Sequence, residues 1–445
     1  MMERIKSNND ELRSNTQSKL DGDPKTDWFC NKNGLLLKTY GWTVKNAIGI
    51  ILLIHGFTVH ARLNFMKINL KMPNKNEGLV VDNNNYYIYK DSWIEKFNQS
   101  GYSVYALDLQ GHGESQSLGN IRGDINCFDD LVDDVIQYMN KIQDEISNDN
   151  QTNNDISNDD KTRDEYHDIV PTNKKRLPMY IMGHSMGGSI GIRILQLLGK
   201  EKEKNINYGD ANNYKKGKAI LNNSTNINEI DNDMYYMNNS TDYGSDNSCA
   251  STSATINAIV SGKDEGCYNY LDKLNIKGCV TLSGMMRLKT PFGSGNKSFK
   301  YFYIPITNFL SRVAPHTLFS SEARYKRSEY VANICKYDKF RNNNGVKFKC
   351  ISELMKATIT LRCDINYMPK NIPILFMHSK DDDVCCYKGT APFHNKVKIK
   401  KKELYTVDNM GHAITIEPGN EEILNKIIDW ISNLRNNGED EIEDE

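Results

Sequence analysis

Six short apolar runs, most of them separated by helical patterns, limit the folds that this chain can adopt. They are AIGIILLIHG, YSVYALDLQGHG, LPMYIMGHS, IKGCVTLSG, IPILFMHS and VKIKKKELYTV, which begin at residues 47, 102, 177, 276, 372 and 397. Most are apolar throughout, as expected of parallel strands that are covered on both faces. Residues 128–142 and 421–434 repeat apolar positions every three or four residues, and 91–101 begins on a serine cap signal and ends at a glycine. This alternation predicts an α/β fold with a mostly parallel, doubly wound sheet.

Polar segments interrupt this order. Residues 143–176 and 201–268 are rich in Asn, Asp, Ser and Lys, and residues 68–85 form a shorter segment of the same kind. Such segments bury too little apolar surface to offset the entropy of ordering, so we expect three low-complexity insertions that are disordered or loosely ordered. Without them roughly 300 residues remain, which is the size of one large α/β domain with an additional cover.

The remaining chain divides into a core, an inserted cap and two polar ends. We expect the core in residues 29–288 and 371–436, and a helical cap in residues 289–370, where the aromatic cluster FKYFYIPITNFL occurs between two strands. Open α/β sheets have their sites at the carboxyl ends of the strands, and we expect the cap to cover that edge. Residues 1–28 read as a polar extension and residues 437–445 as an acidic tail.

Charge and hydropathy argue against several classes of partner. The chain has 56 basic and 57 acidic side chains, so no global field favours nucleic acid or an anionic membrane. The N-terminus has no apolar region typical of a secretory signal, and residues 47–54 are too few to span a bilayer. Ten cysteines without a C-x-x-C or zinc spacing are typical of reduced thiols. We therefore expect a cytoplasmic protein, with export or peripheral membrane contact left open and no protein partner identifiable.

The run KVKIKKKEL is the one local feature that could attract an anionic membrane. Alternating lysines on an edge strand more often prevent the strand from pairing with another chain. We favour this second interpretation of the run.

The most specific motif is GHSMGG, which begins at Gly183. Gly183, Ser185 and Gly187 stand between an apolar strand and an apolar helix, which is the context of a nucleophile elbow. Small residues are needed because this turn is tight and strained, and the turn holds the Ser185 hydroxyl out at the carboxyl edge of the sheet. The same letters could form an ordinary turn with a solvent-facing serine, but the flanking strand and helix favour a nucleophile.

A serine hydroxyl needs a base before it can act as a nucleophile. His412 follows the last predicted strand and precedes the final helix, where sheets with such an elbow carry the base. Acyl transfer also needs hydrogen-bond donors for the oxyanion. We expect the backbone N–H of Met186, directly after the serine, and the N–H of Phe57, which a turn at Gly56 can direct at the same point. No phosphate loop, dinucleotide motif or zinc signature is present, so we expect neither a cofactor nor a metal.

A serine and histidine of this kind work with a third residue, an acid that accepts the Nδ1–H of His412 and orients its ring. This acid should follow the strand IPILFM, where the sequence continues HSKDDDVCC. A metal site is disfavoured because Cys385 and Cys386 are adjacent and their side chains diverge, and the glycine and distal glutamate of a calcium loop are missing. Neighbouring side chains point in different directions, so only one of Asp381, Asp382 and Asp383 should reach the histidine.

Taken together, these motifs resemble a known family. HGFTVHAR, YALDLQGHGESQS, GHSMGGSIG and NMGHAITIEPGNEEILNKIIDWI are similar to the monoglyceride lipase and lysophospholipase group of α/β-hydrolases. The Asn-rich insertions and the wording of the motifs resemble the lysophospholipase-like family of malaria parasites (Plasmodium). The resemblance covers most of residues 30–435 and implies an α/β-hydrolase fold, with a helical cap inserted before the strand that carries the acid.

The resemblance also implies roles for individual residues. Ser185 corresponds to the nucleophile, His412 to the base, and Phe57 and Met186 to the oxyanion donors. The family's acid motif, H-G-x-x-D-x-apolar, implies Asp382 as the acid, although this chain has Ser379 in place of the glycine. Counting three residues from His378 would instead give Asp381, and Asp383 fits neither count.

The implied function is that of a serine esterase, a lysophospholipase or monoacylglycerol lipase, that cleaves single-chain acyl esters of lipids through an acyl-enzyme. A small-molecule carboxylesterase, an acyl-protein thioesterase and a non-catalytic lipid-binding protein are the alternatives. Cap residues could contact the acyl chain, although most aromatic residues of the cap more simply form its own core. The candidates are Tyr301, Phe302, Tyr303, Ile306, Phe309 and Leu310.

Overall fold

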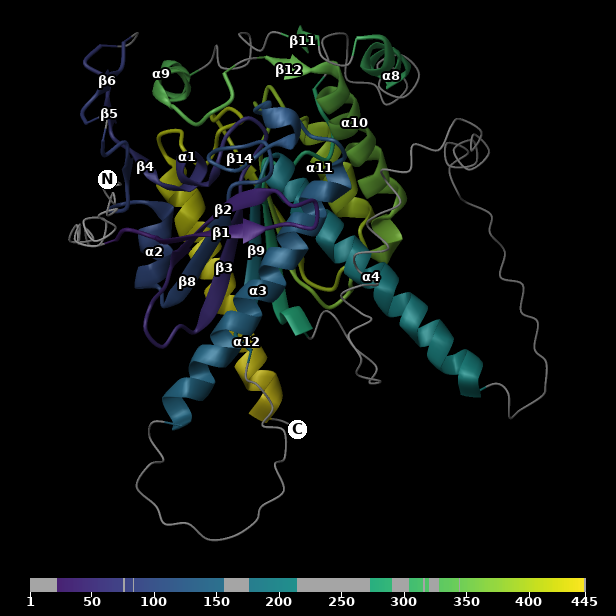
Figure 1. Cartoon of the computed structure of the whole chain (residues 1–445). Coiled ribbons are helices and arrows are strands. Elements are labelled where there is room, and N and C mark those ends of the chain that lie inside the picture. Colours follow the sequence, from purple (N-terminus) through teal and green to yellow (C-terminus); the bar gives the residue numbers. More distant parts are fainter. Residues whose placement is uncertain are drawn as a thin grey trace, which may run out of the picture.

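The structure is a computed structural model of the whole chain (Figure 1). It describes residues 22–74, 77–82, 84–155, 176–213, 273–289, 304–314, 317–319, 328–343 and 345–443.

An eight-stranded sheet forms the centre of the molecule. Its first two strands pair antiparallel with their neighbours, and the other six run parallel to one another. In sheet order the strands are β1 (Lys25–Cys30), β2 (Leu36–Trp42), β8 (Tyr102–Leu107), β3 (Gly49–Ile54), β9 (Met179–His184), β10 (Ile276–Leu282), β13 (Ile374–Ser379) and β14 (Lys402–Val407).

Helices cover both faces of this sheet. Side chains of β3 alternate between the two faces, so Ile50 and Leu52 join one apolar cluster while Ile51 and Leu53 join the other. The first cluster includes residues of α3 (Phe128–Asp155), α4 (Met186–Asn213), α10 (Phe348–Cys363) and α11 (Tyr387–Lys396). The second includes residues of α1 (Ala61–Phe65), α2 (Trp93–Gln99) and α12 (Asn420–Glu443). The prediction of a mostly parallel, doubly wound sheet is confirmed.

Local signals set the ends of the helices. The hydroxyl of Ser92 accepts a hydrogen bond from the N–H of Glu95 over 3.2 Å and caps the start of α2, as the sequence predicts. After α2, Gly101 has a φ of 87°, a left-handed conformation that glycine adopts without steric cost. The chain can therefore turn directly from α2 into β8.

The two edges of the sheet differ from the sequence prediction. β1 begins at Lys25, inside the segment predicted as a polar extension, because its side chains are mostly exposed and give no apolar signal. β14 begins at Lys402, whereas the apolar run predicts a strand from Val397. The lysines before β14 therefore lie in a loop, and they do not block pairing with another chain as members of an edge strand. Lys402 itself donates to the carbonyl oxygen of Val397 over 2.7 Å.

Parts of the predicted insertions have regular structure. Residues 68–85 contribute to two short antiparallel ladders, β4 (Lys67–Ile68) with β7 (Tyr87–Ile88) and β5 (Leu70–Lys71) with β6 (Leu79–Val80). α3 and α4 continue into the predicted insertions as far as Asp155 and Asn213, and α12 continues into the acidic tail as far as Glu443. The remaining residues of the two long insertions, 156–175 and 214–268, lie outside the described residues.

The segment between β10 and β13 is mainly helical where it is described. Its elements are α8 (Ile304–Val313), β11 (Leu318–Phe319), α9 (Glu329–Tyr337), β12 (Val346–Lys347), α10 and the 3₁₀ helix η4 (Ile365–Tyr367). In Figure 1, α8, α9, β11 and β12 lie along the top of the molecule, and α10 runs from the top down beside α4. That residues 289–370 act as a cap stays a prediction.

Two further observations concern the described residues as a whole. None of their helices combines the length and the apolarity needed to cross a bilayer. The eight cysteines among them are free thiols, and burial raises the pKa of the Cys279 thiol in β10 to about 12.

The burial of the central strand leads to a prediction about stability. Leu52 in β3 is fully buried, so Leu52→Ala should lower the free energy of unfolding in urea by about 2–5 kcal/mol. Leu36→Ala is the control, because Leu36 in β2 is 40% exposed and should lose less than about 1 kcal/mol. Equal losses in the two variants would contradict a core centred on β3.

Candidate active site

Ser185 lies at the tight turn between β9 and α4. Its φ of 54° is left-handed, which is uncommon for a residue other than glycine and marks a strained turn. The turn requires glycine on both sides: a Cβ on Gly183 would overlap the backbone of Gly187, and a Cβ on Gly187 would overlap the carbonyl of Ile54 in β3. The sequence spacing of small residues therefore reflects close contact between three backbone segments.

His412 and Asp382 reach Ser185 from the loops that follow β14 and β13. His412 Nε2 lies 2.8 Å from Ser185 Oγ, and His412 Nδ1 lies 2.8 Å from Asp382 Oδ2. A carboxylate only accepts hydrogen bonds, so Nδ1 carries the proton and Nε2 is left to accept the proton of the Ser185 hydroxyl. All three side chains are less than 10% exposed.

Of the three adjacent aspartates, the structure brings Asp382 to His412. Its carboxylate is buried, and its Oδ1 accepts hydrogen bonds from the N–H groups of Val384 and Cys385, each over 2.8 Å. Asp381 is exposed and Asp383 is half-buried. The turn is fixed upstream by Ser379, whose hydroxyl donates to the carbonyl of Met410 over 2.6 Å. Ser379 thus joins the two loops that carry Asp382 and His412.

His378 is a second histidine beside Asp382, which the sequence analysis used only to count residues. Its Nε2 lies 3.3 Å from Asp382 Oδ2 and 3.1 Å from the carbonyl oxygen of Cys385. Both neighbours only accept, so Nε2 carries the proton, and the Thr390 hydroxyl can donate to Nδ1 over 2.9 Å. His378 is fully buried and helps to orient the carboxylate.

These contacts determine the charge of Asp382. Burial by itself raises the pKa of its carboxyl group. The charge of a protonated His412, with the hydrogen bonds from His378 and His412, outweighs burial and holds the pKa of Asp382 well below its usual range. Asp382 is therefore an anion that can stabilise an imidazolium at His412.

The two predicted oxyanion donors lie beside Ser185. A Cβ on Gly56 would come within 3.1 Å of Ser185 Cβ, which is tighter than an ordinary contact, so the loop approaches the serine closely at this glycine. The left-handed residue of this turn is Thr58, with a φ of 67°, and not Gly56. Among the described residues, no acceptor takes a hydrogen bond from the N–H of Phe57 or Met186. Both groups are therefore available to a ligand.

Asn64 in α1 and His184 in the elbow support the site, and the sequence analysis did not find these roles. Asn64 Oδ1 accepts from the N–H of Gly56 over 3.1 Å, and Asn64 Nδ2 donates to Thr415 over 2.7 Å. His184 Nε2 donates to the carbonyl oxygen of His412 over 2.9 Å. Burial and, next, the neighbouring His412 lower the pKa of His184 to about 3, so this ring is neutral. His184 is part of the quoted motif, whereas nothing in the sequence marks Asn64.

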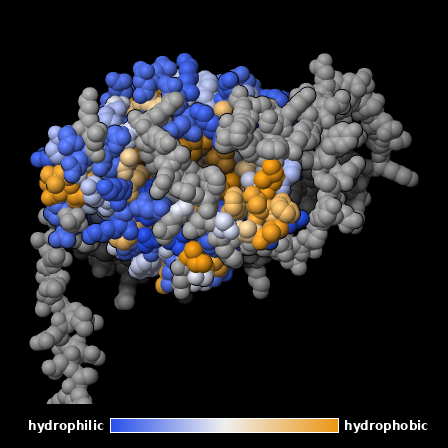
Figure 2. Space-filling view, turned by 90° about the horizontal axis from the view of Figure 1, so that it is seen from above, coloured by the Kyte–Doolittle hydropathy of each residue, from blue (hydrophilic) through white to orange (hydrophobic). Residues whose placement is uncertain are grey.

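The structure does not place the predicted acyl-contact residues around the site in the way that it places the predicted triad. Tyr301, Phe302 and Tyr303 lie outside the described residues. Ile306 and Phe309 are 40% and 63% exposed on α8, so their side chains lie at the molecular surface and not in an enclosed channel. Figure 2 shows apolar surface on the side of the upper face where Figure 1 has α8. Contact of these residues, or of the half-buried Leu310, with an acyl chain stays a prediction.

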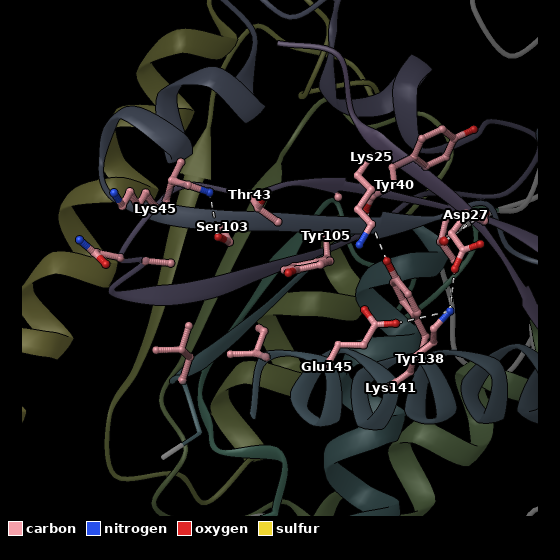
Figure 3. A pocket seen from close by; sticks show the side chains of 17 residues that line it. Lys25, Asp27, Tyr40, Thr43, Lys45, Ser103, Tyr105, Tyr138, Lys141 and Glu145 are labelled. Atoms are coloured by element: carbon pink, nitrogen blue, oxygen red, sulfur yellow. Dashed lines mark hydrogen bonds and ion pairs between the residues drawn. The ribbon is translucent and has the colours of Figure 1, made fainter. Parts of the chain in front are cut away.

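A cleft of about 710 Å³ lies away from this site (Figure 3). Ser103 and Leu177 on its wall are close to the first residues of β8 and β9, so the cleft is at the amino ends of the strands. The Lys141 ammonium on its wall is paired with Asp27 and Glu145. The cleft does not take part in the chemistry at Ser185, which is at the carboxyl ends.

A mostly parallel sheet with helices on both faces and a strained serine turn between strand and helix defines the α/β-hydrolase fold. The chain has this fold. Residues 83–152 and 267–419, half of the chain, match the family Hydrolase_4, described as "Serine aminopeptidase, S33", and the chain belongs to this family. The matched segments contain Asp382 and His412, and Ser185 lies between them.

Solved structures share the fold at low sequence identity. A soluble variant of monoglyceride lipase from Saccharomyces cerevisiae, in complex with a substrate analog, is 15% identical with a TM-score of 0.55, over 93% of this chain and 96% of that one. A carboxyl esterase from Bacillus coagulans, in complex with glycerol, is 14% identical with a TM-score of 0.52, over 93% and 99%. A lipase in an open form is 13% identical with a TM-score of 0.53, over 92% and 99%. Comparison with curated protein sequences gives no match.

The geometry around the three aspartates leads to a prediction about activity. Asp382→Asn should lower kcat for an ester substrate by about 10⁴, by analogy with the acid of serine proteases, because His412 loses the partner that sets its tautomer. Asp381→Asn and Asp383→Asn are the matched controls and should retain kcat within about threefold. A large loss of kcat in either control, with normal activity in Asp382→Asn, would contradict Asp382 and identify the acid as the aspartate replaced in that control.

The lowered pKa of Asp382 leads to a second prediction. A carboxylate whose pKa is lower in the folded than in the unfolded chain adds stability above the unfolded pKa, about 4, and this stability is lost as pH falls towards the folded pKa. The difference in free energy of unfolding between wild type and Asp382→Asn should therefore shrink as pH falls from about 5 to about 2. Urea denaturation at several pH values measures it. A constant difference would contradict the buried ion pair.

Proposed function

We propose that the chain is a serine esterase in which Ser185 is the nucleophile, His412 the general base and acid, and Asp382 the acid that orients His412. The observation that carries the proposal is the line of contacts from Ser185 Oγ through His412 to Asp382, with both links 2.8 Å long. The strained left-handed turn at Ser185 supports the same role, because it presents the hydroxyl at the end of the sheet.

In the first half of the reaction, His412 Nε2 takes the proton of Ser185 as Oγ attacks the ester carbonyl carbon. The carbonyl oxygen becomes an oxyanion, which the N–H groups of Phe57 and Met186 stabilise. Asp382 stabilises the imidazolium that forms at His412. When the carbon–oxygen bond of the ester breaks, His412 gives its proton to the leaving alcohol, and an acyl group remains on Ser185.

In the second half, water repeats these steps on the acyl-enzyme. His412 takes a proton from water, the resulting hydroxide attacks the acyl carbon, and the same two N–H groups stabilise the second oxyanion. The bond to Ser185 Oγ then breaks, and His412 returns the proton to Oγ. The products are a carboxylic acid and the restored enzyme.

We propose single-chain lipid esters, such as lysophospholipids or monoacylglycerols, as the substrates. Three half-buried apolar side chains belong to segments that contact the site: Phe57 follows Gly56, the N–H of Val384 donates to Asp382, and Leu288 pairs with Cys385. Apolar side chains there favour an acyl chain over a charged group. The monoglyceride lipase of similar fold supports this class by analogy only. The sequence motifs that resemble malaria-parasite lysophospholipases support the same substrates. The exposed apolar side chains of α8 would suit peripheral contact with a lipid surface.

The same triad could serve other acyl substrates. A small-molecule carboxylesterase and an acyl-protein thioesterase would use identical chemistry, and the family description favours an aminopeptidase as a second candidate. Four substrates assayed in parallel distinguish them: lysophosphatidylcholine, monoolein, a short p-nitrophenyl ester and an amino-acid p-nitroanilide. We expect turnover of the first two. Turnover of the short ester alone would contradict a lipid substrate, and turnover of the anilide alone would identify a peptidase.

Catalysis itself is tested through Ser185. A fluorophosphonate probe should label the wild-type chain and leave Ser185→Ala unlabelled, and Ser185→Ala should lose at least about 10³ in kcat, because the attacking oxygen is absent. Circular dichroism of both chains serves as the folding control. A folded wild-type chain that the probe does not label would favour a non-catalytic lipid-binding protein.

A further inference from the structure

A second histidine–aspartate pair lies next to the candidate active site, and nothing in the proposed reaction uses it. His60 Nε2 is 3.1 Å from Asp338 Oδ1, and both side chains are fully buried. His60 ends the loop that contains Phe57, whereas Asp338 directly follows α9 in the segment predicted as a cap. The pair therefore joins the oxyanion loop to a segment that is 278 residues away in the sequence.

Further groups fix the Asp338 carboxylate in place. Its Oδ1 accepts from the N–H groups of Phe340 and Arg341, each over 2.8 Å, and its Oδ2 accepts from the Tyr87 hydroxyl over 2.7 Å. Burial raises the pKa of Asp338, but the hydrogen bonds from His60 and Tyr87 and the charge of a protonated His60 outweigh it and hold the pKa below its ordinary value. Asp338 is therefore an anion with donors from three separate segments.

The turn that Asp338 organises also contacts the oxyanion loop directly. The N–H of Asn342 donates to the carbonyl oxygen of Thr58 over 2.9 Å. Thr58 is β-branched and has a φ of 67°, a conformation that costs roughly 1–3 kcal/mol and persists only when its surroundings impose it. The hydrogen bond from Asn342 constrains Thr58 itself, which directly follows Phe57. The contact of His60 with Asp338 constrains the chain two residues further on.

The same segment contacts the loop of the base. Val331 and Cys335 of α9 pack with Ala413, which directly follows His412. Tyr86, directly before β7, donates from its hydroxyl to the carbonyl oxygen of Ile334 in α9 over 2.8 Å. α9 and the turn after it therefore contact both loops that converge on Ser185.

We propose that Asp338 and His60 are positioning residues that hold the N–H of Phe57 at the oxyanion, an inference that rests on the proposed esterase function. An oxyanion donor acts only when it lies within hydrogen-bond distance of the developing charge, and a displacement of about 1 Å can cost about 10²-fold in rate. The loop cannot hold this position by local preference, because Thr58 is in a disfavoured conformation. The buried hydrogen bond between His60 and the ionised Asp338 supplies the missing constraint.

Asp338→Asn tests the proposal with a minimal change in shape. Asparagine keeps an acceptor for Phe340 and Arg341 but removes the charge that binds His60. For a short p-nitrophenyl ester, kcat should fall about 10–100-fold while KM changes less than about twofold, because the donor acts on the transition state and not on the bound ester. Tyr87→Phe removes one hydrogen bond to the same carboxylate and should lower kcat about two- to fivefold.

Asp364→Asn is the matched control. Asp364 is also a largely buried carboxylate, and its Oδ2 pairs with Arg193 over 2.5 Å and with Lys200 over 2.6 Å. Arg193 is two turns of α4 beyond Ser185, and the proposed reaction does not use Asp364. The control should lower Tm about as much as Asp338→Asn and leave kcat unchanged. Equal kcat in Asp338→Asn and Asp364→Asn at equal Tm would overturn the proposal.

Hydrogen exchange gives a readout that does not depend on activity. The amides of Gly56 and Asn342, which donate to Asn64 and to the carbonyl oxygen of Thr58, should exchange faster in Asp338→Asn than in wild type, and those in β3 should not. If Asp338→Asn does not fold, the same comparison is made with Tyr87→Phe.

An inactive wild type with this exchange pattern would overturn the esterase function while leaving the positioning contact in place. An active wild type without it would overturn the positioning role alone.

Discussion

The backbone turn at Ser185 is the constraint on which the rest of the site depends. It lies where β9 ends and α4 begins, and it fits only because Gly183 and Gly187 allow β9, α4 and β3 to touch. A strained turn persists when the packing around it has no alternative, and here both faces of the sheet are covered by apolar clusters. The core thus stabilises a conformation that the peptide alone would avoid.

Two buried carboxylates organise the loops around that turn. Asp382 and Asp338 each receive backbone N–H groups on one oxygen and a histidine from a distant segment. Ionised groups are costly to bury unless their hydrogen bonds are satisfied, so each carboxylate strongly specifies where its partners lie. One specifies the position of His412 and the other that of His60. Loops with little regular structure thereby obtain defined positions.

Much of the fold could be predicted from the sequence because its signals are local. The parallel strands are apolar throughout, since both faces are covered, and α2 carries its own Ser92 cap. The edges were harder to predict. β1 buries little and reads as a polar extension, and the lysines before β14 lie in a loop and not in the strand. An edge strand depends on a neighbour that is distant in sequence, so its own residues need not show a pattern.

The sequence by itself determined the turn at Ser185, the order of the six parallel strands, and the loops that would carry a base and an acid. These follow from glycine spacing and hydrophobic periodicity, which act over a few residues. Only the tertiary structure decided that Asp382 is the aspartate that faces His412, that His378 and Asn64 support the site, and that Asp338 reaches His60. Each of these is a contact between distant segments, and among them only Asp382 was indicated beforehand, by the motif that resembles the family. The tertiary structure also decided that Ile306 and Phe309 face the molecular surface, because the orientation of α8 depends on what the helix packs against.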